Sequence, residues 1–93
     1  MNDKDSLLLL KFVKVLSNED RLGIVKLLKK DGVLCAMDIG KQFYLEQSTT
    51  SHHLNLMKRV GLVKVQKKGR NIFYSLDQDM LRKRLEQLNL VLL

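Results

Sequence analysis

The feature that most constrains the fold is the stretch of residues 47–76, where a helical pattern gives way to a strand pattern at a glycine. Its first half, Q-S-T-T-S-H-H-L-N-L-M-K-R-V, begins with small polar residues and ends at Gly61. Its second half has two short runs, residues 62–67 and 71–76, joined by Lys68-Gly69-Arg70. Glycine commonly ends a helix, and a glycine turn between two such runs predicts a hairpin. We therefore expect a helix followed directly by a two-stranded ribbon.

Charge is distributed unevenly around this stretch. It contains six lysines and arginines and no acid, whereas the whole chain has ten acids and a net charge of +7. A positive charge of this size favours polyanions as partners. The alternative, that excess lysine only keeps a small protein soluble, does not explain the uneven placement. Because a basic helix and ribbon suit the phosphates and grooves of a duplex, the pattern predicts double-stranded DNA as the partner.

Three helices are expected before this stretch. The first covers residues 5–16, and the second starts at a Ser17 or Asn18 cap and ends at Asp31-Gly32. Residues 33–35 can form a short extended segment, and a third helix is expected over residues 36–43. The apolar residues at helical spacing in the second helix are Leu22, Val25 and Leu28.

A last helix is expected from Asp77 to the C-terminus. One face of it carries Met80, Leu81, Leu85, Leu88 and Leu92. The sequence ends on Leu-Val-Leu-Leu, which would leave a large apolar patch exposed on a monomer. Because such patches are usually covered, we expect residues 1–16 and 77–93 to be the dimerisation helices of a symmetric homodimer.

The expected order of elements is helix, helix, helix–turn–helix, β-wing, helix. This is a winged helix–turn–helix pattern, mainly α with a small β-hairpin. Residues 1–93 are enough for a single domain, with the helix–turn–helix at 36–60 and the wing at 62–76. The one cysteine excludes an intrachain disulfide and fits a reducing cytosol. No apolar run approaches the ~18 residues that span a bilayer, so we expect a cytoplasmic protein without a membrane partner.

The expected helix 47–60 has a narrow apolar seam and a polar face. With Thr50 at the centre of the buried side and about 100° per residue, Leu54 and Met57 lie beside it and His53 borders it. The opposite side carries a hydroxyl, an imidazole, an amide and a guanidinium, from Ser48, His52, Asn55 and Arg59. These groups match base edges and phosphates. An ordinary solvated helix usually carries Glu–Lys pairs, and this face has no acid.

Two segments carry a family resemblance. The run Q-S-T-T-S-H-H-L-N-L-M-K-R-V-G-L-V, with a wing ending K-G-R-N-I-F-Y-S-L, resembles the arsenic-repressor (ArsR/SmtB) family of bacterial winged-helix repressors. N-E-D-R-L-G-I-V-K-L-L is similar to that family's second helix, so the resemblance covers residues 8–80. It implies a homodimer that binds an imperfect inverted repeat in promoter DNA. The positions that match the family's DNA-reading helix and wing tip are Gln47, Ser48, Thr49, Ser51, His52, Lys67, Lys68 and Arg70.

The chain departs from the family pattern in the turn before this helix. Tyr44 stands where many members have glycine, and a non-glycine residue in a left-handed turn costs about 1 kcal/mol. Glu46 stands where members have a serine cap, and glutamate is a poorer N-cap. The helix start is therefore open.

Family members often bind a metal or metalloid, through a Cys-x-Cys near the third helix or through Asp and His on the last helix. Here L-C-A-M-D retains Cys35 but has Met37 at the second position, and the last helix offers Asp77 and Asp79 without histidine. Arsenite prefers three thiolates, and a thioether helps only with soft copper(I). We expect no cofactor and no metal inducer. Cys35 is expected to be a small buried residue, and a sensing role for it stays open.

Two other function classes match the sequence less well. A winged-helix protein–protein interaction module, acting as antagonist or adaptor, would have a recognition face rich in apolar or acidic residues. An enzyme is not expected, since no carboxylate pair, Cys–His–Asn set or Gly-rich phosphate loop is visible. The leading prediction is a sequence-specific transcriptional regulator that represses by occupying a promoter. Its operator, target genes and inducing signal, and the choice between repression and activation, stay open.

Overall fold

The computed structural model describes residues 1–93 as five helices and a small sheet. The predicted order of elements is confirmed, with ends that differ by a residue or two. In chain order the elements are α1 (Asp3–Leu16), α2 (Glu19–Asp31), β1 (Leu34–Cys35), α3 (Ala36–Gln42), α4 (Gln47–Arg59), β2 (Val63–Lys68), β3 (Asn71–Leu76) and α5 (Gln78–Leu92). This is a winged helix–turn–helix fold.

The sheet is one strand wider than the predicted hairpin. Its three strands are antiparallel in the order β1-β3-β2. β2 and β3 pair from Val63 opposite Leu76 to Lys68 opposite Asn71, and Gly69 opens the turn between them with a φ of 61°. β1 pairs with the other edge of β3 through residues 34–35. Through this pairing, β1, which directly precedes α3, connects the helix–turn–helix to the wing by backbone hydrogen bonds.

Side-chain caps define some helix starts and not others. Asn18 caps α2, since its Oδ1 accepts the Arg21 N–H at 3.0 Å. Asp77 caps α5 by accepting the Met80 N–H at 3.1 Å. Glu46, at the N-cap of α4, makes no side-chain hydrogen bond. The choice between Ser17 and Asn18 is therefore resolved as Asn18, and Glu46 is a poor cap, as its residue type predicts.

The core lies between α1, α2, α3, α4 and the sheet. Its buried side chains are Phe12, Ile24, Leu28, Ile39, Leu54, Met57, Leu62, Val63, Tyr74 and Leu76. The predicted apolar face of α2 was partly wrong: Leu22 is 43% exposed, and Ile24 is buried in its place. Cys35 was expected to be buried, but it is only half-buried in β1.

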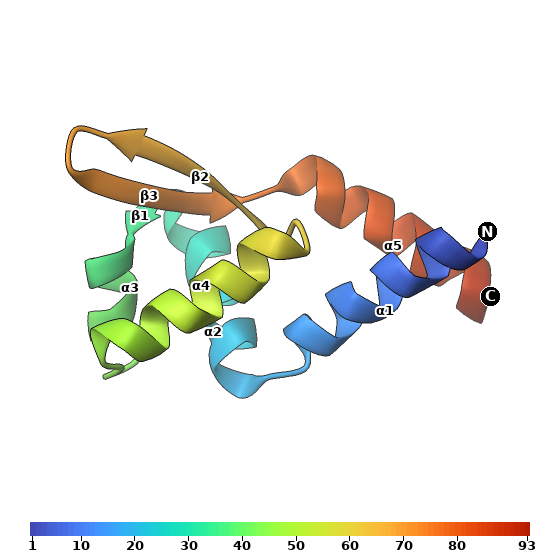
Figure 1. Cartoon of the computed structure of the whole chain (residues 1–93), viewed down its shortest axis with the longest axis horizontal. Helices are drawn as coiled ribbons and strands as arrows, with labels where there is room; N and C mark the ends of the chain where they lie inside the picture. Colours follow the sequence, from blue (N-terminus) through green and yellow to red (C-terminus); the bar gives the residue numbers. More distant parts are fainter.

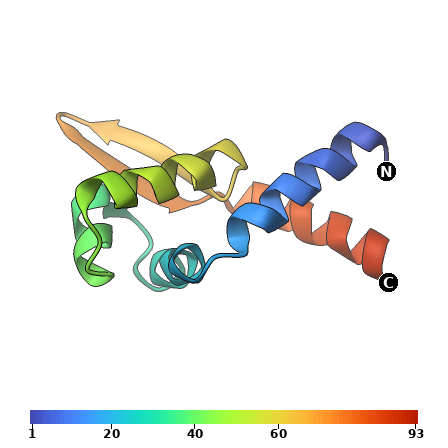
Figure 2. The ribbon, with the colours of Figure 1, turned by 60° about the horizontal axis from the view of Figure 1, so that its bottom comes forward.

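The last helix also differs from expectation. Its buried residues are Arg84 and Gln87, whereas the predicted apolar face leaves Leu85 and Leu92 exposed. The first helix likewise buries Leu9 and Phe12 but leaves Leu10 65% exposed. The reason is geometric, because α1 and α5 cross at an angle: they are drawn together toward the termini in Figure 1 and apart in Figure 2, and so contact each other only along part of their length.

The molecule is elongated. Its principal extents are 40 × 24 × 22 Å, and α1, α5 and both termini lie at the end opposite α3 and the tip of the wing (Figures 1 and 2). The accessible surface is 6768 Å², against about 5,500 Å² for a compact monomer of this length. None of the five helices is both long and apolar enough to span a membrane.

Candidate nucleic-acid interface

The two faces of α4 lie as the sequence predicts. Thr50, Leu54 and Met57 are buried against the core, and His53 is buried beside them. All ten candidate DNA contacts are exposed: Gln47, Ser48, Thr49, Ser51, His52, Asn55, Arg59, Lys67, Lys68 and Arg70. Lys58 and Lys64 are exposed as well, so all six cations of residues 47–76 face solvent.

Most of these candidates come together at one end of the molecule. Both ribbon views place the tip of the β2–β3 wing and the N-terminal end of α4 at the end away from the termini (Figures 1 and 2). Arg59 is the exception, since it ends α4 on the side of α1 and α5. At about 1.5 Å per residue, it lies about 16 Å along the helix axis from Ser48.

Close packing of α3 sets the position of α4. Gly40 is buried, and a Cβ built on it would lie 2.8 Å from Thr50 Oγ1. Thr50 Oγ1 in turn donates to the Glu46 carbonyl at 3.0 Å. Only a residue without a side chain allows the two helices to approach this closely. Gly40 and Thr50 therefore fix the distance between α3 and the start of α4.

The turn between these helices adopts a left-handed conformation at a non-glycine residue. Tyr44 has a φ of 54°, and the Leu45 N–H donates to the Gly40 carbonyl at 3.0 Å. The Tyr44 side chain is 96% exposed and makes no hydrogen bond. The expected departure from the family's glycine is therefore accommodated by backbone strain.

His53 serves the packing of α4 on α2. Its Nδ1 accepts from Arg21 Nη1 at 3.2 Å, and its Nε2 lies 3.7 Å from Asp20 Oδ2. An arginine can only donate, so Nδ1 carries no proton in this contact. Burial, followed by the Arg21 charge, lowers the pKa of His53 against the opposing effect of Asp20. His53 is therefore neutral at pH 7, and the expectation that it packs inside is confirmed.

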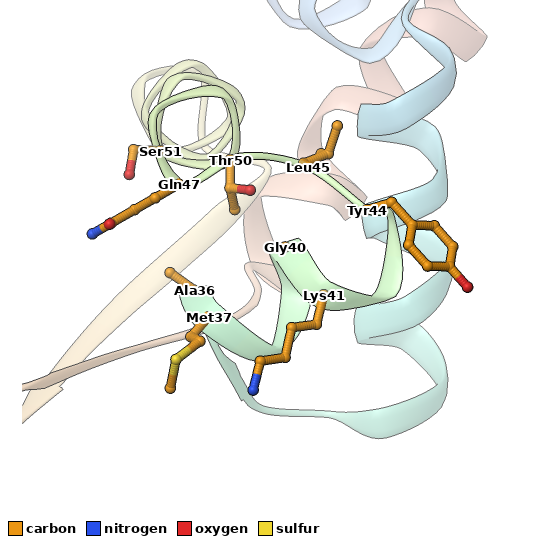
Figure 3. A pocket seen from close by; sticks show the side chains of 9 residues that line it. All are labelled: Ala36, Met37, Gly40, Lys41, Tyr44, Leu45, Gln47, Thr50 and Ser51. Atoms are coloured by element: carbon orange, nitrogen blue, oxygen red, sulfur yellow. The ribbon is translucent and has the colours of Figure 1, made fainter.

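A cavity of about 640 Å³ adjoins the exposed face of α4. Residues of α3, the turn and α4 line it: Ala36, Met37, Gly40, Lys41, Tyr44, Leu45, Gln47, Thr50 and Ser51. Met37 and Lys41 project from α3 in the same direction (Figure 3). Gln47 and Ser51 belong to the ten candidates, whereas Lys41 does not, because the sequence prediction was confined to residues 47–76. The sequence carries no clear signal for Lys41, because its place beside α4 depends on how α3 packs against that helix.

The residues available for a metal do not match the sites described for metal-binding members. No group of three or more His, Cys, Asp or Glu side chains is close enough to hold an ion. Cys35 is the only thiol, and Met37 lies exposed on α3. A single thiolate beside a thioether is a poor donor set for cadmium or arsenite.

The sequence is similar to known regulators. The profile described as bacterial regulatory protein, arsR family, matches residues 18–65. A "cadmium resistance transcriptional regulatory protein CadC homolog" from Staphylococcus aureus is 35% identical over 77 residues, covering 83% of this chain and 64% of that protein. The "transcriptional repressor SdpR" of Bacillus subtilis is 36% identical over 69 residues, covering 74% and 76%. The chain spans 53–64% of the length of the cadmium-resistance regulators that it matches.

Solved structures share the fold. An "ArsR-like transcriptional regulator" from Rhodococcus sp. RHA1 superposes with a TM-score of 0.84 at 25% identity, covering 95% of this chain and 82% of that one. The "homodimeric winged helix-turn-helix DNA-binding domain" Mb0332 of Mycobacterium bovis gives a TM-score of 0.76 at 24% identity, covering 98% and 86%. With the profile match and the relatives above 30% identity, these comparisons lead to one conclusion: the chain belongs to the arsR family of bacterial regulatory proteins.

Proposed function

We propose that this protein is a sequence-specific DNA-binding transcriptional regulator that acts as a dimeric repressor. The observation that carries the proposal is the surface formed by α4 and the wing, on which six exposed cations occur without any acid. Membership of the arsR family supports the same function. The fold supplies an exposed helix and a ribbon of matching charge, which are the parts that a duplex requires.

In this proposal the N-terminal half of α4 enters the major groove. Because no side chain caps α4, the N–H groups of its first turn remain available to a DNA phosphate. Base edges are read by exposed side chains of the same turn: Gln47, Ser48, Thr49, Ser51 and His52. Asn55 and Arg59 extend the contact along α4, and the wing tip, Lys67, Lys68 and Arg70, follows the backbone.

We propose that α1 and α5, within residues 1–16 and 77–93, form the dimer interface. Leu10 is 65% exposed and Leu90 is 75% exposed. The surface exceeds that of a compact monomer by about 1,200 Å², which is more than the about 800 Å² that each partner buries in a standard interface. A twofold dimer would hold two α4 helices about 34 Å apart, one turn of B-form DNA.

A metal inducer is not part of this proposal. The names of several relatives refer to cadmium or arsenical resistance, but the single thiol and the lack of histidine on α5 make this chain a poor ligand for either ion. Addition of cadmium or arsenite is therefore expected to leave DNA affinity unchanged. A tenfold loss of affinity with equimolar metal would contradict the proposal, with Cys35→Ser as the matched variant.

The test is selection of bound fragments from random DNA, followed by fluorescence anisotropy on the selected sequence. We expect an inverted repeat with half-sites about ten base pairs apart. Arg70→Ala should weaken binding to all sequences alike and lower the slope of log affinity against log salt concentration by about one. Ser48→Ala should instead reduce the difference in affinity between the selected sequence and random DNA. A protein that stays monomeric, or ignores DNA in dilute buffer, would refute this function and favour a protein-binding module.

A further inference from the structure

A second cavity lies at the end of α4 that is remote from the proposed recognition turn. It has a volume of about 570 Å³ and lies between α1, the C-terminal end of α4 and the start of α5. Small-molecule sites in proteins usually occupy about 300–1,000 Å³. Among the ten candidate DNA contacts only Arg59 lines it. The cavity is therefore separate from most of the surface proposed to read DNA.

The lining of this cavity combines apolar side chains with cations. Leu8, Leu56 and Met80 are among its apolar residues. Its charged residues are all positive: Lys11, Lys14, Lys58, Arg59 and Arg84. Positive charges around a cavity with low-dielectric walls concentrate anions inside it. A duplex backbone cannot enter a concave apolar site, so this charge matches a small amphipathic anion.

Arg84 is the buried member of this set. It is 5% exposed, its Nη1 donates to Gln87 Oε1 at 2.9 Å, and its Nε is buried without a hydrogen-bond partner. No carboxylate lies within ion-pair distance of it. A buried guanidinium without an opposite charge is unfavourable. Its positive charge is thus not neutralised within the chain, and an anion in the cavity that Arg84 lines would supply the missing opposite charge.

We propose that this cavity binds a small organic carboxylate with an aliphatic or aromatic body. The carboxylate accepts from the Arg84 guanidinium, since planar carboxylates match its fork of donors. The body contacts Leu8, Leu56 and Met80. Lys11 and Lys14 lie on α1 beside the cavity and strengthen the field that attracts the anion.

The same site connects the recognition helix to the dimerisation helices. Its walls include Lys58 to Gly61 at the end of α4 and residues of both α1 and α5. Met80 of α5 packs closely against Gly61, since a Cβ added at Gly61 would lie 2.5 Å from Met80 Cγ. A ligand held there would bias the position of α4 relative to α5, which changes DNA affinity if the two positions bind DNA differently. This regulatory step rests on the proposed function, whereas carboxylate binding does not.

Calorimetry and thermal shift on the purified full chain, without DNA, test the site directly. Octanoate and benzoate are the probes, and octanamide and benzamide are neutral controls of matched shape. We expect the carboxylates to bind and raise Tm, and the amides to bind at least about tenfold more weakly. Arg84→Gln should weaken carboxylate binding by at least about tenfold. Arg82→Gln is the matched control, because Arg82 is an exposed cation of α5 outside the cavity.

A second variant keeps the test valid if Arg84→Gln does not fold. Leu8→Trp fills the cavity from its rim and should abolish carboxylate binding, and because Leu8 is 38% exposed and outside the core cluster, the chain should still fold. Equal binding of acids and amides, or no binding of either carboxylate, overturns the proposal.

The regulatory step is measured last, by DNA anisotropy with and without octanoate. We expect the affinity for the selected sequence to change by at least about fivefold, and the change to disappear in Arg84→Gln. An unchanged affinity overturns the regulatory step and leaves the binding site standing. A chain that binds octanoate but never DNA refutes the proposed function and not the site.

Discussion

The close approach of Gly40 and Thr50 gives the sharpest test of how α3 positions α4. A Cβ at residue 40 would lie 2.8 Å from Thr50 Oγ1, which is closer than side-chain atoms normally approach, and 3.6 Å from Thr50 Cβ (Figure 3). Thr50 is stiff because it is β-branched, and its Oγ1 is held by the hydrogen bond to Glu46. Gly40→Ala must therefore displace either the hydroxyl or the whole of α3.

The expected cost is the difference of two opposing effects. Overpacking a buried site costs about 1–3 kcal/mol, and alanine in a helix gains about 1 kcal/mol over glycine. We expect Gly40→Ala to lower the free energy of unfolding by about 0–2 kcal/mol, or Tm by up to about 15 °C for a chain of this size. Lys41→Ala, at an exposed position of the same helix, is the control and should change Tm little.

A double-mutant cycle isolates the clash. In a Thr50→Ala background the nearest remaining side-chain atom is Cβ at an ordinary 3.6 Å, so Gly40→Ala should then be neutral or stabilising. Urea denaturation of the four proteins gives a coupling free energy, which we expect to be about 1–3 kcal/mol, the whole cost of the overpacking. If Gly40→Ala costs the same in both backgrounds, Thr50 Oγ1 does not clash with the added methyl group, and the proposed cause of the destabilisation is refuted.

Three further results are expected. His53 is flanked by Asp20, Arg21 and His52, and its pKa is lower in the folded state than in the unfolded chain. As the pH falls, the unfolded chain is therefore protonated at His53 first. The contribution of neutral His53 to the free energy of unfolding is complete above about pH 6.5 and is lost as the pH falls through the folded-state pKa. Urea melts from about pH 7.5 to 5 check this, and a His53→Gln profile equally steep there would contradict it. Tyr44→Gly should raise the free energy of unfolding by about 1 kcal/mol, because glycine adopts the positive φ of residue 44 without strain, whereas Tyr44→Ala should give no such gain. Thermal melts in which the glycine variant is no more stable than the alanine variant would count against backbone strain at this residue. With three to five phosphate contacts per protomer, DNA affinity should fall about 10³–10⁵-fold from 50 to 200 mM salt, and a flat anisotropy series would exclude that footprint.

The sequence was sufficient where structure depends on neighbouring residues. A cap at Ser17 or Asn18, the end of α2 at Gly32 and the Gly69 turn all follow from local backbone chemistry, and the structure selects Asn18 as the cap. The two faces of α4 follow from helical spacing, because a helix fixes the direction of every side chain once one is placed. The weak N-cap at Glu46 was predictable from residue type, whereas the positive φ at Tyr44 was expected only from the family resemblance, in which glycine occupies that turn.

Only the tertiary structure decided features that join distant parts of the chain. β1 pairs with β3 across some forty residues, as in Leu34 opposite Tyr74, and no local pattern specifies that partner. Burial of Ile24 and Arg84 in place of Leu22 and Leu85 depends on which side of α2 and α5 meets other elements. The cationic cavity between α1, α4 and α5 arises in the same way. Local propensity sets what each segment can form, whereas packing between segments decides which of its faces becomes the interior and which becomes a site.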